Sequence, residues 1–549
     1  MRIKLTVSHY LLITIFLLAA FLRFWQLGSN PPSLTPDEAA LGYNAYSILK
    51  TGRDEYGKFL PIIFKSFGDY KPGLYVYLTV PSVAVFGLTE FATRFPSALS
   101  GVVSVFLLYL IVRSLFTNHR SLGTIAALLL AINPWAIYLS RGAWEANLSL
   151  TLTLAGTHFF LKFLEKQEFL ILSAFFFGLT LLTYQGAKLS GGIVVLILVF
   201  LYFKKLISSS KKILAGSLIT GVLIIFPIIL SLFRGQTFRL TIYSIFSYPR
   251  PTVALQNFLD EGGERVGTLS YYLFHSETLN FKRAILGRWF NHFSGRFLFF
   301  EGDWSNPKQS APYVGMFIFA DLILLIAGFV GLVRMGAKKE VLFVFLWMVL
   351  APLPAALSRN EVQSVRAFNL SVPLIIMSAF GLTQLFKWRK WLLGLFVFIY
   401  LVNYSYFLDE YFIHQPKHNS QYWAYGYKQV VQIVSSTQSN YKTIKIQQSF
   451  NQPYIYFLFF EKYNPSAYQK QANLVPSEFA GDVGFQTKLD NMQFTPIDWS
   501  VNKNEHGTLF VADPIAISPE DTSNSNLFKV IKDIKYLNGI TAFRVIEVK

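Results

Sequence analysis

Residues 2–27 read RIKLTVSHYLLITIFLLAAFLRFWQL, a basic N-terminal end followed by a long apolar stretch. A cleaved secretory signal has the same start, but it needs a small-residue cleavage pattern at its end. Arg23, Phe24 and Trp25 occupy that place here. Since a spanning helix needs roughly 20 mostly apolar residues, the stretch predicts an uncleaved first membrane span.

The rest of the chain has the composition of a membrane protein. It has 549 residues, of which 53% are hydrophobic and 15% charged, whereas a soluble chain carries about a quarter charged residues. The 54 Phe and 29 Tyr suit helices that face lipid and end at the headgroups. The absence of cysteine excludes disulfides, thiolate metal sites and a Cys nucleophile.

Apolar stretches of spanning length predict eleven membrane helices. They lie near 8–27, 96–113, 122–139, 146–164, 169–185, 190–203, 213–233, 312–333, 341–357, 368–386 and 391–410. One further stretch, Gly73 to Phe86, is shorter, a length more typical of a re-entrant or interfacial segment. We expect that it does not cross the membrane.

Charge placement supports that choice. If the short stretch does not cross, every second connection is strongly basic. These connections are the N-terminus (Arg2, Lys4), Arg113 to Arg120, Lys162 to Lys166, Lys204 to Lys212, Arg334 to Lys339 and Lys387 to Lys390. Basic loops stay cytoplasmic, so we expect a multi-pass membrane protein with a cytoplasmic N-terminus and an extracytoplasmic C-terminus. The simple loops favour the plasma membrane over the endoplasmic reticulum. The same rule accounts for the net charge of +18 without nucleic acid.

From about Tyr411 the chain becomes more polar and strand-like runs appear. The runs are Tyr441–Gln448, Gly507–Ala512, Phe528–Tyr536 and Thr541–Val548, the last with partly alternating apolar residues. The sequence therefore predicts a mainly α fold: a polytopic helical bundle over 1–410, with large outer loops at 28–95 and 234–311. A small extracytoplasmic α/β domain at 411–549 follows it.

The first predicted outer loops are dense in charge close to the spans. Asp37 and Glu38 follow the first span, Lys71 precedes the short apolar stretch and Arg94 opens the next span. Charge at the end of a span is costly and often functional. A solvated loop whose charges only keep it wet is the simpler interpretation. Likewise Arg141 and Glu145 of the second outer loop can merely pair, since they are four residues apart.

The later outer loops add further candidates. Phe281 to Phe293 has the pattern of an amphipathic interfacial helix, and Asp303 follows an aromatic run. Four cations of the outer loops fall at one membrane face: Lys71, Arg94, Arg141 and Arg366. A lipid phosphate at headgroup level needs such partners, because Arg and Lys make charge-assisted hydrogen bonds to phosphate.

Several of these motifs together resemble the GT-C glycosyltransferases, in particular the protein O-mannosyltransferase and aminoarabinose-transferase superfamily. The motifs are Asp37-Glu38 after the first span, Lys71-Pro72, and Arg94-Phe95-Pro96-Ser97 opening the next span. The similarity covers roughly residues 8–200 and then fades to a shared topology. Two features depart from the family: Gly73 stands where relatives often have a second proline, and 234–311 has no counterpart of the β-trefoil insertion of eukaryotic mannosyltransferases.

The resemblance implies transfer of a sugar, generally with inversion, from a polyprenyl phosphate such as dolichyl or undecaprenyl phosphate to an acceptor on the outer face. Asp37 would be the general base that deprotonates the acceptor hydroxyl, and Glu38 would orient the base or the acceptor. Lys71 and Arg94 would hold the donor phosphate as a leaving group.

The remaining candidates follow from position. Glu145 matches the second acidic position of the family in the next outer loop, where the resemblance implies a role at the sugar or the acceptor, paired with Arg141. Asp303 and Arg366 are assigned to substrate binding on position alone.

Two other classes of protein remain open. A transporter or lipid flippase would carry charged or broken-helix sites near the midplane, but ionisable residues inside the predicted spans are few, with Asp321 and His158 among them. A receptor or assembly factor would use the tail to bind partners. No cofactor is expected, and the eight His residues show no close metal-ligand spacing. Sugar and acceptor, whether protein, lipid or glycan, are left open.

Overall fold

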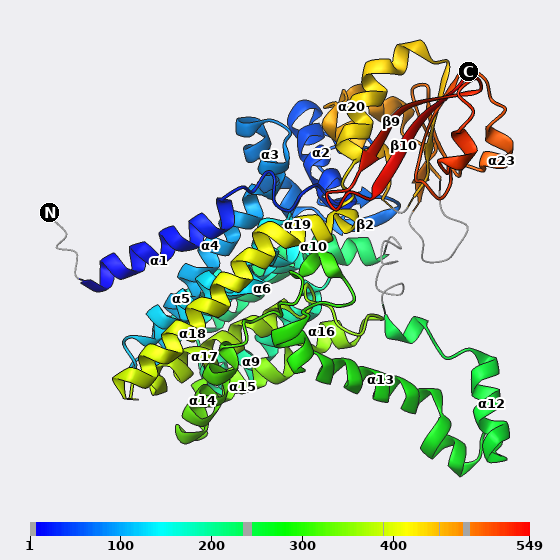
Figure 1. Cartoon of the computed structure of the whole chain (residues 1–549). Coiled ribbons are helices and arrows are strands. Elements are labelled where there is room, and N and C mark those ends of the chain that lie inside the picture. Colours follow the sequence, from blue (N-terminus) through cyan, green and yellow to red (C-terminus); the bar gives the residue numbers. More distant parts are fainter. Residues whose placement is uncertain (1–6, 234–243, 388, 450, 476–483) are drawn as a thin grey trace, which may run out of the picture.

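The computed structural model describes residues 7–233, 244–387, 389–449, 451–475 and 484–549. Long helices form a bundle, and the C-terminal part of the chain forms a mixed sheet with short helices at one end of it (Figure 1). The fold is mainly α, as predicted: a polytopic membrane bundle with a small α/β domain. The first ten residues of the predicted loop 234–311 lie outside the described part of the chain.

Every predicted span falls on a helix. The matching helices are α1 (Val7–Phe24), α4 (Glu90–Leu115), α5 (Leu122–Ile132) with α6 (Pro134–Arg141), α7 (Glu145–Phe163), α8 (Phe169–Leu181), α9 (Ala187–Ile207), α10 (Lys211–Phe233), α14 (Asp321–Arg334), α15 (Lys339–Leu350) with α16 (Leu353–Ala356), α17 (Ser371–Leu385) and α18 (Lys390–Asp409).

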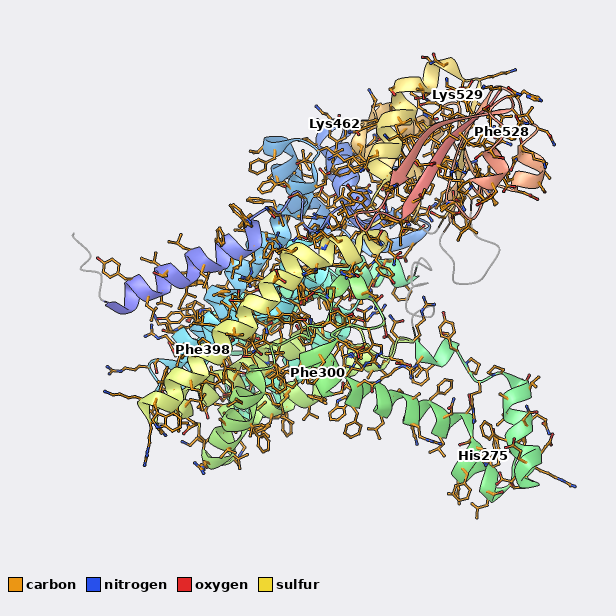
Figure 2. The ribbon with its side chains drawn as sticks, viewed as in Figure 1. His275, Phe300, Phe398, Lys462, Phe528 and Lys529 are labelled. Atoms are coloured by element: carbon orange, nitrogen blue, oxygen red, sulfur yellow. The ribbon has the colours of Figure 1, made fainter. Side chains whose placement is uncertain are left out.

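Within the described ranges, six helical segments are long and apolar enough to cross a membrane, and the α5–α6 pair, bent by 55°, makes a seventh. The helices α1 and α8 are apolar but shorter, so the count of eleven stays a prediction. Side chains on the outside of the bundle are apolar, as lipid contact requires. Phe398 of α18, labelled in Figure 2, is 65% exposed.

The predicted span 312–333 is wrong at its start, because α14 begins only at Asp321. The preceding residues run as irregular chain through the protein interior. Met316 N donates to Phe297 O at 3.2 Å, and Trp135 N donates to Met316 O at 3.2 Å. Gly315 lies so close to the Leu298 backbone that no side chain fits. Apolar composition alone cannot distinguish burial in protein from burial in lipid.

The first predicted loop is more ordered than expected. It contains the helix α2 (Pro36–Thr51), the antiparallel strands β1 (Ile63–Ser66) and β2 (Asp69–Pro72), and the helix α3 (Leu74–Phe86). The 13 residues of α3 span about 20 Å at 1.5 Å per residue, less than the roughly 30 Å hydrocarbon core. It packs against α2 and α4. That α3 does not cross stays a prediction.

Three of the six predicted basic connections meet at one end of the bundle. A single cleft is lined by the C-terminal ends of α4 and α7, by Tyr202 near the end of α9, and by the turn before α15. The residues concerned are Ser114, Leu115, Leu161, Leu164, Glu165, Tyr202, Ala337, Lys338, Lys339 and Glu340. Three of the predicted cytoplasmic connections therefore lie side by side.

At the other side of the bundle, two helices of the fourth predicted loop form an arm. They are α12 (Thr252–Gly262) and α13 (Glu277–Asn291), which project away from the other helices (Figure 1), with His275 far out on the arm (Figure 2). The amphipathic helix predicted at Phe281 to Phe293 is confirmed as a helix by α13, although it ends two residues earlier.

The C-terminal domain is built on a six-stranded sheet of order β6-β7-β3-β8-β10-β9. The strands are β6 (Lys488–Leu489), β7 (Met492–Thr495), β3 (Thr443–Gln447), β8 (Thr508–Ala512), β10 (Thr541–Val548) and β9 (Phe528–Lys535). The pairs β3–β7 and β3–β8 are parallel, and the others are antiparallel. All four strand-like runs predicted from the sequence are confirmed. Helices α20 (Tyr427–Thr437), α21 (Tyr454–Phe460), α22 (Pro465–Gln471) and α23 (Trp499–Asn502) accompany the sheet, and the short helix α19 (Gln415–His418) follows the end of α18.

This domain shares one hydrophobic core with the first predicted loop. The helix α21 packs on α2, where a side chain on Gly42 would overlap the ring of Phe459. Gln469 Nε2 donates to Ser47 Oγ at 3.2 Å and to Asp54 O at 3.0 Å. The two segments thus behave as one packed unit.

A buried carboxyl group lies in this unit. Glu55 is fully buried, Asn44 Nδ2 donates to its Oε1 at 3.2 Å, and its backbone N donates to Asn44 Oδ1 at 3.0 Å. Burial raises the pKa of Glu55 to about 8. The charged form is opposed because low-polarity surroundings replace water.

The substitution Glu55→Gln should therefore raise the melting temperature in a pH-dependent way. The pKa of Glu55 rises from an ordinary value of 4.5 to about 8 on folding, so stability of the wild type falls as pH rises through that window. Gln keeps an acceptor for Asn44 and cannot ionise. Thermal unfolding in detergent is measured at pH 5, 7 and 9. The melting temperature of Glu55→Gln should exceed that of the wild type by a difference that grows with pH, whereas the exposed control Glu520→Gln should show no such pH-dependent difference. A pH-independent difference would contradict this.

Candidate functional site

The motif Thr35-Pro36-Asp37-Glu38 forms the N-terminus of α2. Glu38 N donates to Thr35 Oγ1 at 3.3 Å, and Thr35 N donates to Glu38 Oε2 at 2.9 Å. This reciprocal capping box satisfies two helix-end donors, and Pro36 suits the first helical position. Both carboxylates thus lie in the first turn, where the helix dipole favours negative charge.

Glu38 joins three segments of the chain. Its side chain is 2% exposed. Its Oε1 accepts from Arg94 Nε of α4 at 2.9 Å and from Ala143 N of the second predicted loop at 2.9 Å, and its Oε2 closes the capping box. With both oxygens occupied, Glu38 fits a positioning role better than a role at the acceptor.

Arg94 is also fully engaged inside the protein. It is completely buried, donates to Leu27 O at 3.1 Å and Pro31 O at 2.9 Å, and donates to Ser33 O as well. Its guanidinium also lies 5.7 Å from the ring centroid of Trp423. The prediction that Arg94 holds a phosphate does not fit these contacts, because its donors already serve Glu38 and three carbonyls.

Asp37 points the other way. Its side chain is 53% exposed, and one carboxylate oxygen pairs with Lys71 Nζ, whose side chain is 7% exposed. Asp37 lines the cavity described next, and Lys71 does not. Lys71 therefore pairs with the carboxylate of Asp37, whereas the sequence led us to expect Lys71 at the donor phosphate.

A cavity of about 530 Å³ opens beside the N-terminus of α2. Five segments line it: 35–38, 143–146, 184–189, 306–309 and 357–366, together with Ser244, Phe246 and Pro354. Its acidic residues are Asp37, Glu38 and Glu145, and its cations are Lys188, Lys308, Arg359 and Arg366. Of the predicted residues, the cavity thus brings together Asp37, Glu38, Glu145 and Arg366.

The predicted pair of Arg141 with Glu145 is wrong. α6 ends at Arg141 and α7 begins at Glu145, with an extended Gly142 (φ −104°, ψ 167°) between them, so the helical spacing that would join them does not exist. Arg141 is instead buried, donating to Leu22 O and Asn30 O at 2.9 Å each.

Asp303 does not reach the cavity either. It is fully buried and accepts from Ser364 N at 2.6 Å and from Asn306 N at 3.0 Å, and burial raises its pKa to about 6. Since Asn306 lines the cavity and Ser364 lies between lining residues, Asp303 holds two lining segments together. The prediction of direct substrate contact is not supported.

Three cations of the cavity were not assigned from sequence. Lys188 opens α9, Lys308 belongs to the fourth predicted loop, and Arg359 donates to Tyr248 Oη at 3.1 Å. Each lies in a predicted outer loop close to a span, the signal that led to Asp37, but none belongs to a recognisable motif. Only the tertiary fold brings them together.

Among the described residues, one group could hold a metal ion: Asp409, Glu410 and His414, at the end of α18. It does not line the cavity.

Comparison with known proteins agrees with this architecture. A family model described as dolichyl-phosphate-mannose-protein mannosyltransferase matches residues 70–230. ArnT from Cupriavidus metallidurans, solved bound to undecaprenyl phosphate, matches over 98% of both chains with a TM-score of 0.55 and 12% identity. The chain has the GT-C glycosyltransferase fold. An uncharacterized protein from Aquifex aeolicus (strain VF5) is 26% identical over 381 residues, 65% of this chain and 71% of that protein.

The family model covers residues 70–230, and the solved structure shares the fold, so the chain is similar to GT-C membrane glycosyltransferases in both respects. The identity of 12% to the solved structure carries the fold alone, so the roles of individual residues rest on the contacts described above.

Breaking the Glu38–Arg94 pair should destabilise the protein strongly. Arg94→Met leaves Glu38 buried without its cation, which typically costs about 3 to 5 kcal/mol. The control Lys428→Met removes one partner of the more exposed Lys428–Glu90 pair and should change the free energy of unfolding by less than about 1 kcal/mol. Denaturant titration in detergent measures both, and equal effects would show that the buried pair has no special role.

Proposed function

We propose that this protein transfers a sugar from a polyprenyl-phosphate-linked donor to an acceptor hydroxyl, with inversion, on the extracytoplasmic face of the plasma membrane. The observation that carries the proposal is the cavity of about 530 Å³, which an accessible Asp37 shares with four cations. A leaving phosphate and a nucleophilic hydroxyl need these two kinds of group.

Asp37 is the proposed general base. Its carboxylate takes the proton of the acceptor hydroxyl as the oxygen attacks the anomeric carbon from the face opposite the phosphate. The bond between that carbon and the phosphate oxygen breaks, and the polyprenyl phosphate leaves with the electron pair. One displacement of this kind inverts the configuration. Lys71 fixes the orientation of Asp37, and Glu145, which lines the same cavity, is the second acidic residue at the sugar or the acceptor.

The leaving phosphate gains negative charge in this step. The cations Lys188, Lys308, Arg359 and Arg366 line the cavity, and fixed cations stabilise such charge through charge-assisted hydrogen bonds. We therefore assign phosphate binding to this set, in place of Lys71 and Arg94.

The placement of charge supports the proposed side of the membrane. Three predicted basic connections line a cleft formed by the C-terminal ends of α4 and α7 and the turn before α15. The cavity is instead lined by Glu145, at the opposite end of α7, and by Pro354 of α16, which follows the opposite end of α15. Because basic connections stay cytoplasmic, the cavity and the C-terminal domain are assigned to the extracytoplasmic side.

The substitution Asp37→Asn should abolish transfer while leaving the fold intact. Loss of a general base lowers the rate typically 100-fold to 10,000-fold. Purified protein is offered a panel of polyprenyl-phospho-sugars with membrane extract, and released polyprenyl phosphate is measured. The control is Asp409→Asn, which has a similar exposure and a neighbouring nitrogen, His414 Nε2 at 3.3 Å, but lies outside the cavity lining.

Transfer by Asp37→Asn at the wild-type rate would exclude Asp37 as the base. Absence of release by a folded wild type from every donor would instead favour the transporter or flippase alternative.

The cavity cations should act on the donor. Lys308→Gln and Arg366→Gln each remove charge-assisted hydrogen bonds worth about 1.5 to 3 kcal/mol, so kcat/KM for the donor should fall roughly 10-fold to 100-fold. The matched control is Lys338→Gln in the cleft at the other end of the bundle, which should keep wild-type kinetics. Unchanged kcat/KM in both cavity variants would remove these residues from the phosphate site.

A further inference from the structure

The C-terminal domain contacts the first loop through its most apolar helix. In α21, every residue from Tyr454 to Phe459 is at most 1% exposed, and the helix packs on α2. A domain that merely extends from the bundle would bury little of its core against it. Here the buried helix α21 packs directly against α2, the helix that carries Asp37, and supports it.

One side chain of α21 reaches the turn that precedes the catalytic motif. Tyr456 is fully buried, and its hydroxyl donates to Leu34 O at 3.2 Å. Leu34 comes directly before Thr35, whose capping box holds Glu38. The ring of Tyr456 stacks on Tyr427 at 4.4 Å with an interplanar angle of 8°, so the hydroxyl is held by a rigid pair rather than by a flexible side chain.

A second contact of the C-terminal domain supports the start of the segment between α1 and α2, through Arg94. Trp423, 1% exposed, lies 5.7 Å below the guanidinium of Arg94 and 6.3 Å from Trp144 of the cavity lining. Arg94 in turn binds the carbonyls of Leu27 and Pro31. The turn before α2 is thus held from both sides, by the bundle and by the C-terminal domain.

We propose that Tyr456 is a positioning residue of the transferase, which sets the Leu34–Glu38 turn and through it the place of Asp37 in the cavity. The inference rests on the proposed function. If Tyr456 has this role, the C-terminal domain is part of the catalytic unit rather than a separate binding module.

The test compares two single-hydroxyl deletions in the stacked pair. Tyr456→Phe removes the bond to Leu34 O, whereas Tyr427→Phe removes a bond to Ser449 Oγ at 3.1 Å that stays within the C-terminal domain. Both rings and the stack remain, so both variants should fold with similar melting temperatures. A misplaced catalytic group lowers the rate without loss of binding.

We expect Tyr456→Phe to lower kcat roughly 10-fold with the donor KM within about twofold of wild type, and Tyr427→Phe to keep both within about twofold. Hydrogen exchange, read by mass spectrometry, should show faster exchange at residues 34–39 in Tyr456→Phe only. An unchanged exchange pattern at 34–39, or equal loss of kcat in both variants, overturns the proposal.

The exchange measurement separates this inference from the proposed function. If wild-type protein transfers no sugar but Tyr456→Phe alone loosens residues 34–39, the positioning contact stands and the transferase proposal fails.

Discussion

The buried ion pair of Glu38 and Arg94 is the interaction on which the rest of the site depends. Two charges removed from water are tolerated only when each is paired and its remaining hydrogen-bonding atoms are satisfied. Here Glu38 accepts from Arg94, Ala143 N and Thr35 N, and Arg94 donates to three carbonyls of the turn between α1 and α2. Because these bonds are made at once, α4, the second loop and the start of α2 cannot shift independently.

Asp37 owes its position to this arrangement. As the neighbour of Glu38 in the first turn of α2 it must point away from the buried pair, toward the cavity that Glu145 also lines. Lys71 holds the exposed carboxylate from β2, and the C-terminal domain supports the turn from behind through Tyr456. The buried carboxylate of Glu38 fixes the geometry, and the exposed carboxylate of Asp37 is the one proposed as general base.

The bundle was largely predictable, because apolar length and the alternation of basic connections report directly on the membrane. The prediction of a span beginning at residue 312 was wrong because most of the apolar residues between 314 and 320 are buried against protein rather than lipid. One available signal was missed: Thr35 followed by Glu38 is the capping-box pattern, which predicts that a helix begins at Pro36.

In the site, the motif pointed to Asp37 and Glu145, but residue type could not tell whether an arginine binds substrate or carbonyls. Arg94 and Arg141 bind backbone carbonyls because distant turns of the chain bring those carbonyls next to them. Lys308 lines the cavity only because the tertiary fold places its loop there.

Arg94 holds Glu38, and we propose that other cations hold the phosphate. An experimental structure with a bound polyprenyl-phospho-sugar donor would show which cations the phosphate contacts. We expect the phosphate within hydrogen-bonding distance, about 2.7 to 3.2 Å, of one or more of Lys188, Lys308, Arg359 and Arg366. Asp37 should face the anomeric carbon with room for a hydroxyl between them, and the Glu38–Arg94 pair should stay closed. A phosphate bound to Arg94 or Lys71, with that pair opened, would contradict it.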